Sequence, residues 1–121
     1  MFTGLVEETG EILKVEEGPF LRVYIAARKV LEDLKVGDSV AVDGACLTAV
    51  AVEEGGFWVE LAQETLRRTA PTWRVGHRPN LERALKVGEE LGGHMGAGHV
   101  SAVCRTLDLS EDGESRRFTV E

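Results

Sequence analysis

The stretch SVAVDGACLTAVAVEEGGFWVELAQ, residues 39–63, contains three apolar runs separated by two turn signals. Asp43-Gly44 is the first signal and Glu54-Gly55-Gly56 is the second. Dipeptides of this kind reverse a chain between paired strands, because their residues tolerate left-handed backbone angles. The stretch therefore predicts three consecutive strands, with a turn or kink at 43–44 and a hairpin turn at 54–56.

The same pattern continues on both sides of this stretch. Residues 5–18 predict a strand with a bulge at Gly10, and residues 78–85 a last strand. Residues 21–26 predict a half-buried strand, because Leu21, Val23 and Ile25 alternate with Arg22 and Tyr24 on its solvent side. Two short helices are expected, at 27–38 and at 64–69. Six short strands with two small helical insertions indicate an all-β fold, a small closed barrel that is complete by about residue 88.

Composition and charge exclude several classes of protein. The 121 residues carry a net charge of −7 and 43% hydrophobic residues, which suits a globular domain and disfavours nucleic-acid binding. The first ten residues, MFTGLVEETG, lack the features of a signal peptide or a membrane span. Two cysteines make a disulfide framework improbable. We therefore expect a cytoplasmic protein that binds neither nucleic acid nor membrane.

A glycine-rich stretch, LGGHMGAGHV at 91–100, precedes a tail that reads as strand, turn, strand. At an offset of 94 residues, Met1, Gly4, Val6 and Leu13 match Met95, Gly98, Val100 and Leu107. The tail is therefore predicted to be the first hairpin of a second copy of the barrel. This divides the chain into a first barrel at 1–90, and a junction plus the start of a truncated second barrel at 91–121.

Four motifs together resemble the α-type riboflavin synthases, which are built from lumazine-binding barrels. The motifs are MFTGLVEETG at 1–10, GACLTAV at 44–50, ETLRRT at 64–69 and GGHMGAGHV at 92–100. Their order and spacing fit the family along the whole chain. The resemblance implies two six-stranded Greek-key barrels in tandem, of which this chain holds the first and the opening hairpin of the second. It also implies a homo-oligomer, which is usually a trimer in the family. For the shorter chain, a dimer is the alternative.

The resemblance further implies a reaction. It is the dismutation of two 6,7-dimethyl-8-ribityllumazine molecules into riboflavin and 5-amino-6-ribitylamino-pyrimidinedione, a four-carbon transfer in riboflavin biosynthesis without metal or redox cofactor. Lumazine synthase, from the same pathway, is a possible partner. Because one barrel is incomplete, we expect weak activity from this chain alone. The alternative is a non-catalytic protein that binds lumazine or flavin, like the lumazine-carrying antenna proteins.

The residue types that titrate near neutral pH suggest the catalytic groups. Cys46 and His99 are candidates for nucleophile assistance and proton transfer. The resemblance adds Ser39 and Phe2. Two structural explanations remain open: Cys46 as a small buried hydrophobe, and Ser39 as a strand-edge hydroxyl.

A flat ring with a polyhydroxylated chain requires hydroxyls and exposed backbone groups. Thr48 and Thr65 are candidates for the ribityl chain and the backbone of 61–63 for the ring edge, although Glu64 and Thr65 suit helix capping equally well. The resemblance places residues 4–6 and 98–100 against the ligand. The predicted binding set is Gly4, Leu5, Val6, Cys46, Leu47, Thr48, Glu60, Leu61, Ala62, Gln63, Glu64, Thr65, Gly98, His99 and Val100.

Two other interpretations of the glycine-rich stretch are disfavoured. GAG at 96–98 departs from a dinucleotide fingerprint, because Ser101 replaces the third glycine and a strand follows instead of a helix. His94 and His99 are five residues apart, which matches neither a helical nor a strand face, so no metal site is expected.

Overall fold

The computed structural model describes residues 1–85 and 95–121, and most of the regular secondary structure in this part is β-strand. The strands and helices of the first unit are β1 (Glu8–Thr9), β2 (Glu11–Glu16), β3 (Leu21–Ala26), the 3₁₀ turn η1 (Val30–Glu32), β4 (Ser39–Val42), β5 (Ala45–Glu53), β6 (Gly56–Leu61), α1 (Gln63–Arg68) and β7 (Asn80–Arg83). A separate hairpin follows, made of β8 (Thr106–Asp112) and β9 (Ser115–Val120). The all-β fold class is confirmed.

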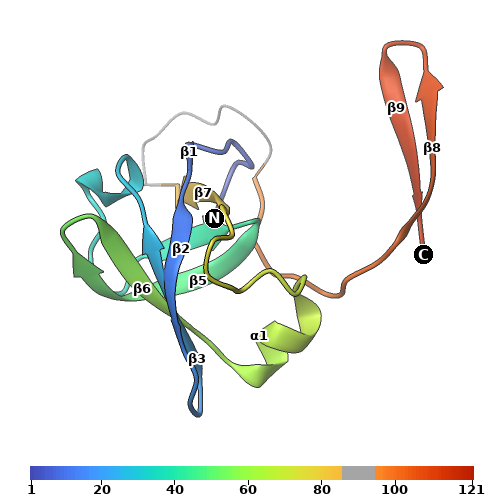
Figure 1. The fold of residues 1–121 in the computed structure, drawn as a ribbon. Helices are drawn as coiled ribbons and strands as arrows, with labels where there is room; N and C mark the ends of the chain where they lie inside the picture. The colour runs from blue at the N-terminus through green and yellow to red at the C-terminus, as the bar shows by residue number, and fades with distance from the viewer. Residues whose placement is uncertain (86–94) are drawn as a thin grey trace.

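The first seven strands form one antiparallel sheet that curls back on itself. Its order is β1-β7-β4-β5-β6-β3-β2, so the two ends of the sheet are β1 and β2, which only Gly10 separates. The Ile12 amide donates to the His77 carbonyl at 2.9 Å, so β2 contacts the segment before β7 as well as β3. Counting β1 and β2 as one interrupted strand, six strands surround a common core (Figure 1).

Glycine is required where this interrupted strand bends. A Cβ at Gly10 would lie 2.7 Å from Leu81 Cδ1 and 2.8 Å from the Ala26 carbonyl oxygen. These distances are shorter than real Cβ contacts, so a side chain at this point would separate the strands. The bulge predicted at Gly10 is thus the point at which one strand passes from one edge of the sheet to the other.

The predicted turns are confirmed. Asp43 and Gly44 both have positive φ, of 49° and 82°, as a type I′ turn between β4 and β5 requires. The predicted helix at 27–38 is only the single turn η1, so the expected length is wrong. The Glu8 carboxylate accepts the Arg28 and Val30 amides at the start of this turn, and Asp33 has already left helical geometry.

The core lies inside the curled sheet and comes from alternate residues of its strands. Tyr24, expected on the solvent side of a half-buried strand, is only 8% exposed, because its ring packs on Trp58 with centroids 5.3 Å apart. The β3 strand is therefore covered on both faces. The main buried residues of the core are Ile12, Val23, Ile25, Val30, Val40, Val42, Leu47, Ala49, Phe57, Val59, Leu61 and Leu81.

Polar contacts fix the N-terminal segment to β7. The buried Glu82 carboxylate accepts the Thr3 amide at 2.7 Å and the Gly4 amide at 3.1 Å. Glu7 forms an ion pair with Arg83 at 2.5 Å and also accepts the Arg83 backbone amide at 2.9 Å. Burial opposes ionisation of Glu7, but the hydrogen bonds and charge of Arg83 outweigh it and hold the Glu7 pKa below its usual value.

Glu7→Gln is expected to lower the free energy of unfolding by about 1–3 kcal/mol at pH 7, because it removes a charge-assisted contact that is largely shielded from water. A carboxylate with a lowered folded-state pKa stabilises the protein above its unfolded pKa, and this contribution is lost as pH falls through the folded pKa. The difference between wild type and variant should therefore shrink in acid. Urea unfolding at neutral and acidic pH measures it. Glu17→Gln, in the exposed β2–β3 turn, is the control, and a constant difference would contradict the assignment.

The β8–β9 hairpin projects away from the first unit, and its side chains are exposed (Figure 1). It repeats the geometry of β2–β3: the register shift between Ile12 and Lys14 recurs between Thr106 and Asp108, 94 residues later. The predicted strand, turn and strand in the tail are confirmed. Exposed hydrophobic residues of this hairpin are Leu107, Leu109, Phe118 and Val120.

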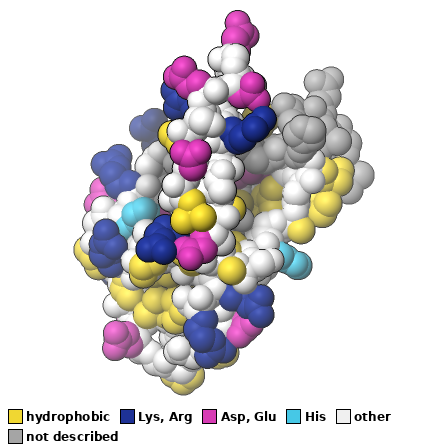
Figure 2. Space-filling view, turned by 90° about the vertical axis from the view of Figure 1, so that its right-hand side faces the viewer, with side chains coloured by type: hydrophobic (Ala, Val, Ile, Leu, Met, Phe, Trp, Pro, Cys, Tyr) yellow, Lys and Arg dark blue, Asp and Glu magenta, His cyan; other side chains and the backbone are white. Residues whose placement is uncertain are grey.

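The face from which the hairpin projects carries acidic and basic side chains side by side, with hydrophobic side chains between them (Figure 2). In residues 1–85 and 95–121 there is no helix of the length and apolar character that a membrane crossing would need.

Candidate functional site

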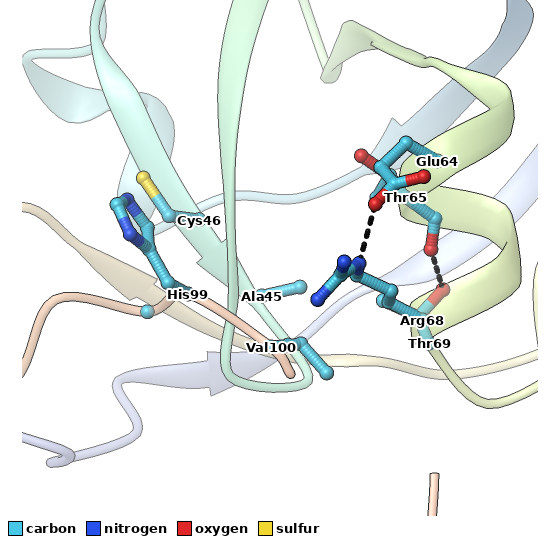
Figure 3. Close-up of a pocket in the computed structure, with 9 residues that line it drawn as sticks. Ala45, Cys46, Glu64, Thr65, Arg68, Thr69, His99 and Val100 are labelled. Atoms are coloured by element: carbon cyan, nitrogen blue, oxygen red, sulfur yellow. Dashed lines mark hydrogen bonds and ion pairs between the residues drawn. The ribbon is translucent and has the colours of Figure 1, made fainter. Parts of the chain in front are cut away.

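One surface cavity brings together residues from three parts of the chain (Figure 3). Its volume is about 190 Å³, and β5, α1 and the segment after residue 97 form its walls. We call it the Cys46 cavity. Its lining residues are Ala45, Cys46, Glu64, Thr65, Arg68, Thr69, Gly98, His99 and Val100.

Strand alternation explains why Cys46 lies at this surface. Its neighbours Ala45 and Leu47 are buried, whereas Cys46 is only partly buried. The Cys46 amide donates to the Gly98 carbonyl at 2.7 Å, which fixes the C-terminal segment against the strand. The chain therefore presents the Cys46 thiol at the wall of a cavity, and the alternative of a fully buried cysteine does not apply.

This contact requires glycine at position 98. Its φ is +77°, and a Cβ there would lie 2.9 Å from Cys46 Cβ and 3.2 Å from Phe2 Cε2. The Gly98 backbone thus lies close to two protein side chains, and buried Phe2 lies beside the cavity as part of its support.

His99 follows directly and is exposed. Its imidazole lies beside the Cys46 thiol, on the side of the cavity that faces α1 (Figure 3). The two groups predicted from sequence to carry proton transfer and nucleophile assistance are thus brought together, although 53 positions separate them in the chain.

Helix α1 supplies the third wall. Glu64 accepts hydrogen bonds from Arg67 at 2.8 Å and from Arg68 at 2.6 Å, and these contacts lower the pKa of the exposed Glu64 carboxyl. The Thr69 hydroxyl donates to the Thr65 carbonyl at 2.8 Å. The N-cap position belongs to Ala62, which has no polar side chain, so the capping interpretation of Glu64 and Thr65 is wrong.

Several predicted residues lie outside the Cys46 cavity. Ser39 and Thr48 face each other on β4 and β5, and Ser39 lines a second cavity of about 320 Å³ beside Arg83. Leu47 and Leu61 are buried in the core. Exposed or partly buried positions elsewhere are Gly4, Leu5, Val6, Glu60, Ala62 and Gln63.

Sequence reasoning missed three residues of the cavity, Ala45, Arg68 and Thr69. Arg68 had a detectable signal, since it follows Glu64 by four residues and such a pair shares one helical face. Ala45 had none, because its place in the wall depends on how distant segments pack.

Among the residues that the structure describes, no three His, Cys, Asp or Glu side chains converge as metal ligands. His94, which was weighed with His99 as a ligand pair, lies outside the described residues.

The molecule is a small Greek-key barrel with one surface cavity lined by a partly buried thiol, an imidazole and threonine hydroxyls. This combination is typical of ligand-binding barrels. The family described as the lumazine binding domain matches residues 3–84. The chain belongs to the lumazine binding domain family.

Curated relatives agree with this assignment. The riboflavin synthase of Brucella abortus (strain 2308) is 39% identical over 99% of this chain and 63% of its own length. The riboflavin synthase of Bacillus subtilis (strain 168) is 37% identical over 92% of this chain and 53% of its own length. The chain thus spans between half and two thirds of these relatives.

Solved structures show the same fold. A crystal structure of LumP complexed with riboflavin aligns with a TM-score of 0.78 at 25% identity, covering 99% of this chain and 66% of that one. LumP complexed with 6,7-dimethyl-8-(1'-D-ribityl) lumazine aligns with the same TM-score and identity, covering 68% of that chain.

Proposed function

We propose that this chain is part of a riboflavin synthase, a transferase that moves a four-carbon unit between two 6,7-dimethyl-8-ribityllumazine molecules. The products are riboflavin and 5-amino-6-ribitylamino-pyrimidinedione. The observation that carries the proposal is that Cys46 and His99 lie side by side at one cavity, in a chain whose relatives are named riboflavin synthase. The lumazine serves as both donor and acceptor, so the proposed reaction takes no separate cofactor.

The proposed roles follow from the chemistry of the groups. The reaction needs a proton removed from an activated methyl group and a nucleophile, or water, added to the acceptor ring. At the cavity, Cys46 supplies a thiol that can act as a nucleophile and His99 an imidazole that can act as a general acid or base. Holding two lumazines in contact supplies the rest of the rate acceleration through proximity. Phe2 acts indirectly in this proposal, by supporting Gly98.

The size of the cavity indicates how the ligand extends. About 190 Å³ is below the range of roughly 300–1,000 Å³ that is typical of small-molecule sites. Ala41 is paired with Cys46, and two residues along, Ser39 is paired with Thr48. Residues two apart on a strand share a face, so this outer face continues from Cys46 to Thr48 and Ser39. We propose that the ligand extends along it, with the ribityl hydroxyls toward Thr48 or Thr65.

We also propose that residues 1–90 form the first barrel and that residues 91–121 begin a second. Three observations support this division. The register shift of β2–β3 recurs in β8–β9 at the same offset. Phe2 and Gly96, equivalent in the two repeats, form a reciprocal antiparallel bridge at 2.7 and 2.5 Å. Gly4 and Gly98, also equivalent, have φ values of 83° and 77°. The bridge and the matching φ values support an approximate local twofold relation between the two proposed repeats.

A polypeptide limited to these 121 residues is expected to form riboflavin at least 100-fold more slowly than the intact synthase of Bacillus subtilis. The physical reason is that the second lumazine needs a complete facing barrel, and effective molarity is lost without it. Riboflavin fluorescence measures the rate from the lumazine. Self-association into a dimer or trimer is proposed as the only means by which like sites meet, so the rate should rise with protein concentration. Equal turnover by the two proteins would contradict the two-barrel requirement.

The alternative function is binding of lumazine or flavin without turnover. The LumP structures support it, because a protein of the same fold is complexed with riboflavin in one of them and with 6,7-dimethyl-8-(1'-D-ribityl) lumazine in the other. Two results would favour this second function. Riboflavin would bind saturably without product formation at any protein concentration, and adding lumazine synthase, the proposed pathway partner, would not lead to product formation. Product formation that Cys46→Ser abolishes would favour the synthase.

Thr65→Val is expected to weaken riboflavin binding about 5- to 150-fold, since a polar group of the ligand loses its partner at a cost of about 1–3 kcal/mol. Thr65 lines the Cys46 cavity and valine nearly preserves its shape. Binding of lumichrome, which lacks the ribityl chain, should change little. Fluorescence titration of both ligands measures the effect. Equal losses for the two ligands would mean that Thr65 acts through the fold of α1.

A further inference from the structure

Residues 98–101 are called here the His99 segment. Its first three residues line the Cys46 cavity, and His99 carries the imidazole. The segment has no regular secondary structure, so its position depends on individual contacts. At its start, the Gly98 carbonyl accepts the Cys46 amide at 2.7 Å. This contact fixes one end of the segment to β5.

The other end is held from α1. The Arg68 guanidinium donates through one terminal nitrogen to the Ser101 carbonyl at 3.3 Å and through Nε to Glu64 at 2.6 Å. Glu64 thus orients the guanidinium, and the guanidinium reaches across the mouth of the cavity (Figure 3). Arg67 pairs with the same carboxylate at 2.8 Å, through its other oxygen.

We propose that Arg68 is a positioning residue, which fixes the far end of the His99 segment and so keeps the imidazole beside Cys46. The proposal deepens the proposed function, on which its relevance to catalysis rests. His99 and Val100 lie between the two anchors, at Gly98 and Ser101. With one anchor removed, the backbone on the Ser101 side gains freedom while the Cys46 contact remains.

The exposure of Arg68 determines which property of the protein changes when its side chain is removed. Its side chain is 51% exposed, and exposed ion pairs contribute little to global stability. Local opening of a segment without regular structure is sensitive to single contacts, because few other contacts oppose it. The proposal therefore predicts a change in access to Cys46 with almost no change in the unfolding temperature.

The test measures the alkylation rate of Cys46 by iodoacetamide in the folded protein, in a Cys104→Ser background because Cys104 is exposed. Arg68→Ala should raise the rate about three- to tenfold, as expected for loss of one exposed anchor. Arg67→Ala is the matched control: it removes a partner of the same Glu64 carboxylate and should change the rate less than about twofold. The alkylation rate of the Arg68→Lys variant should lie between those of wild type and Arg68→Ala, since a single ammonium cannot reproduce the planar guanidinium fork.

The outcomes separate this proposal from the proposed function. Equal alkylation rates for Arg68→Ala and Arg67→Ala, in proteins with the same unfolding temperature, would overturn the anchoring role. If Arg68→Ala fails to fold, Arg68→Lys decides the question by the same comparison. A protein that binds no riboflavin would refute the proposed function while the alkylation comparison still decides the role of Arg68. If riboflavin binds, Arg68→Ala should weaken it about threefold or more, and Arg67→Ala should not.

Discussion

Replacing Gly98 by alanine is expected to weaken riboflavin binding by about 10- to 100-fold, because the left-handed conformation costs an L-residue about 1–2 kcal/mol and the new methyl group adds a clash. The φ of +77° is the first obstacle. The second is the position of the Cβ, 2.9 Å from Cys46 Cβ and 3.2 Å from the Cys46 backbone nitrogen. The segment carrying His99 must then leave β5, and the cavity loses a wall.

Gly96→Ala provides the matched control for this substitution. A Cβ at Gly96 has its nearest contact at 3.8 Å, the Phe2 carbonyl oxygen, so the same chemical change should be tolerated. Fluorescence titration of riboflavin and thermal unfolding should be measured on both variants. Because Gly98 lies outside the strands of the barrel, the unfolding temperature of the Gly98→Ala variant should hardly change. A loss of binding that is equal in the two variants would show that the close approach to Cys46 is not the cause.

Gly56→Ala is expected to lower the free energy of unfolding by about 3 kcal/mol or more, because it overpacks a site enclosed by backbone and an aromatic ring. Its Cβ would lie 2.5 Å from Tyr24 Cζ and 2.7 Å from the Ile25 carbonyl oxygen. The Tyr24 ring is itself packed on Trp58, so it has little room to move. The carbonyl belongs to β3, which pairs with β6 along its full length, and its displacement would disturb that ladder.

Gly18→Ala is the control for the stability measurement. Its Cβ would meet nothing closer than 3.6 Å, and its φ lies outside the left-handed range. Alanine there should change stability by less than about 1 kcal/mol, and in the stabilising direction through the unfolded chain. Urea unfolding of both variants measures the difference. Similar values would show that β3 adapts to the added methyl group, contrary to the packing argument.

The fold was predictable where the sequence acts locally. Asp43-Gly44 specifies its turn through the backbone angles that these two residues tolerate, and the alternation of Val23 and Ile25 specifies an inward face. The short η1 turn was less predictable, because the Glu8 carboxylate, from 22 positions away, caps the amide of Val30. The burial of Tyr24 likewise depends on a partner from another strand.

The cavity was predictable only in part, for a similar reason. The residue types of Cys46 and His99 indicated their chemistry, but their proximity arises from the contact between β5 and Gly98, which no local pattern encodes. The same applies to Arg68, whose target at Ser101 is 33 positions away. Predicted positions such as Leu5 and Val6 are exposed, so their roles stay predictions that depend on what covers them.

The closure of the sheet between β1 and β7 has a consequence for how the protein is made. Glu8 is paired with Leu81, and the Met1 carbonyl accepts the Leu85 amide, so these early residues of the barrel are synthesised more than 70 positions before their partners. Hairpins such as β5–β6 can form at once from neighbours in the chain. Closure must wait, and topologies dominated by such distant pairings fold slowly. During synthesis, β1 and the outer edge of β2 therefore stay unpaired, and the nascent chain is most vulnerable to aggregation until residues 76–85 emerge.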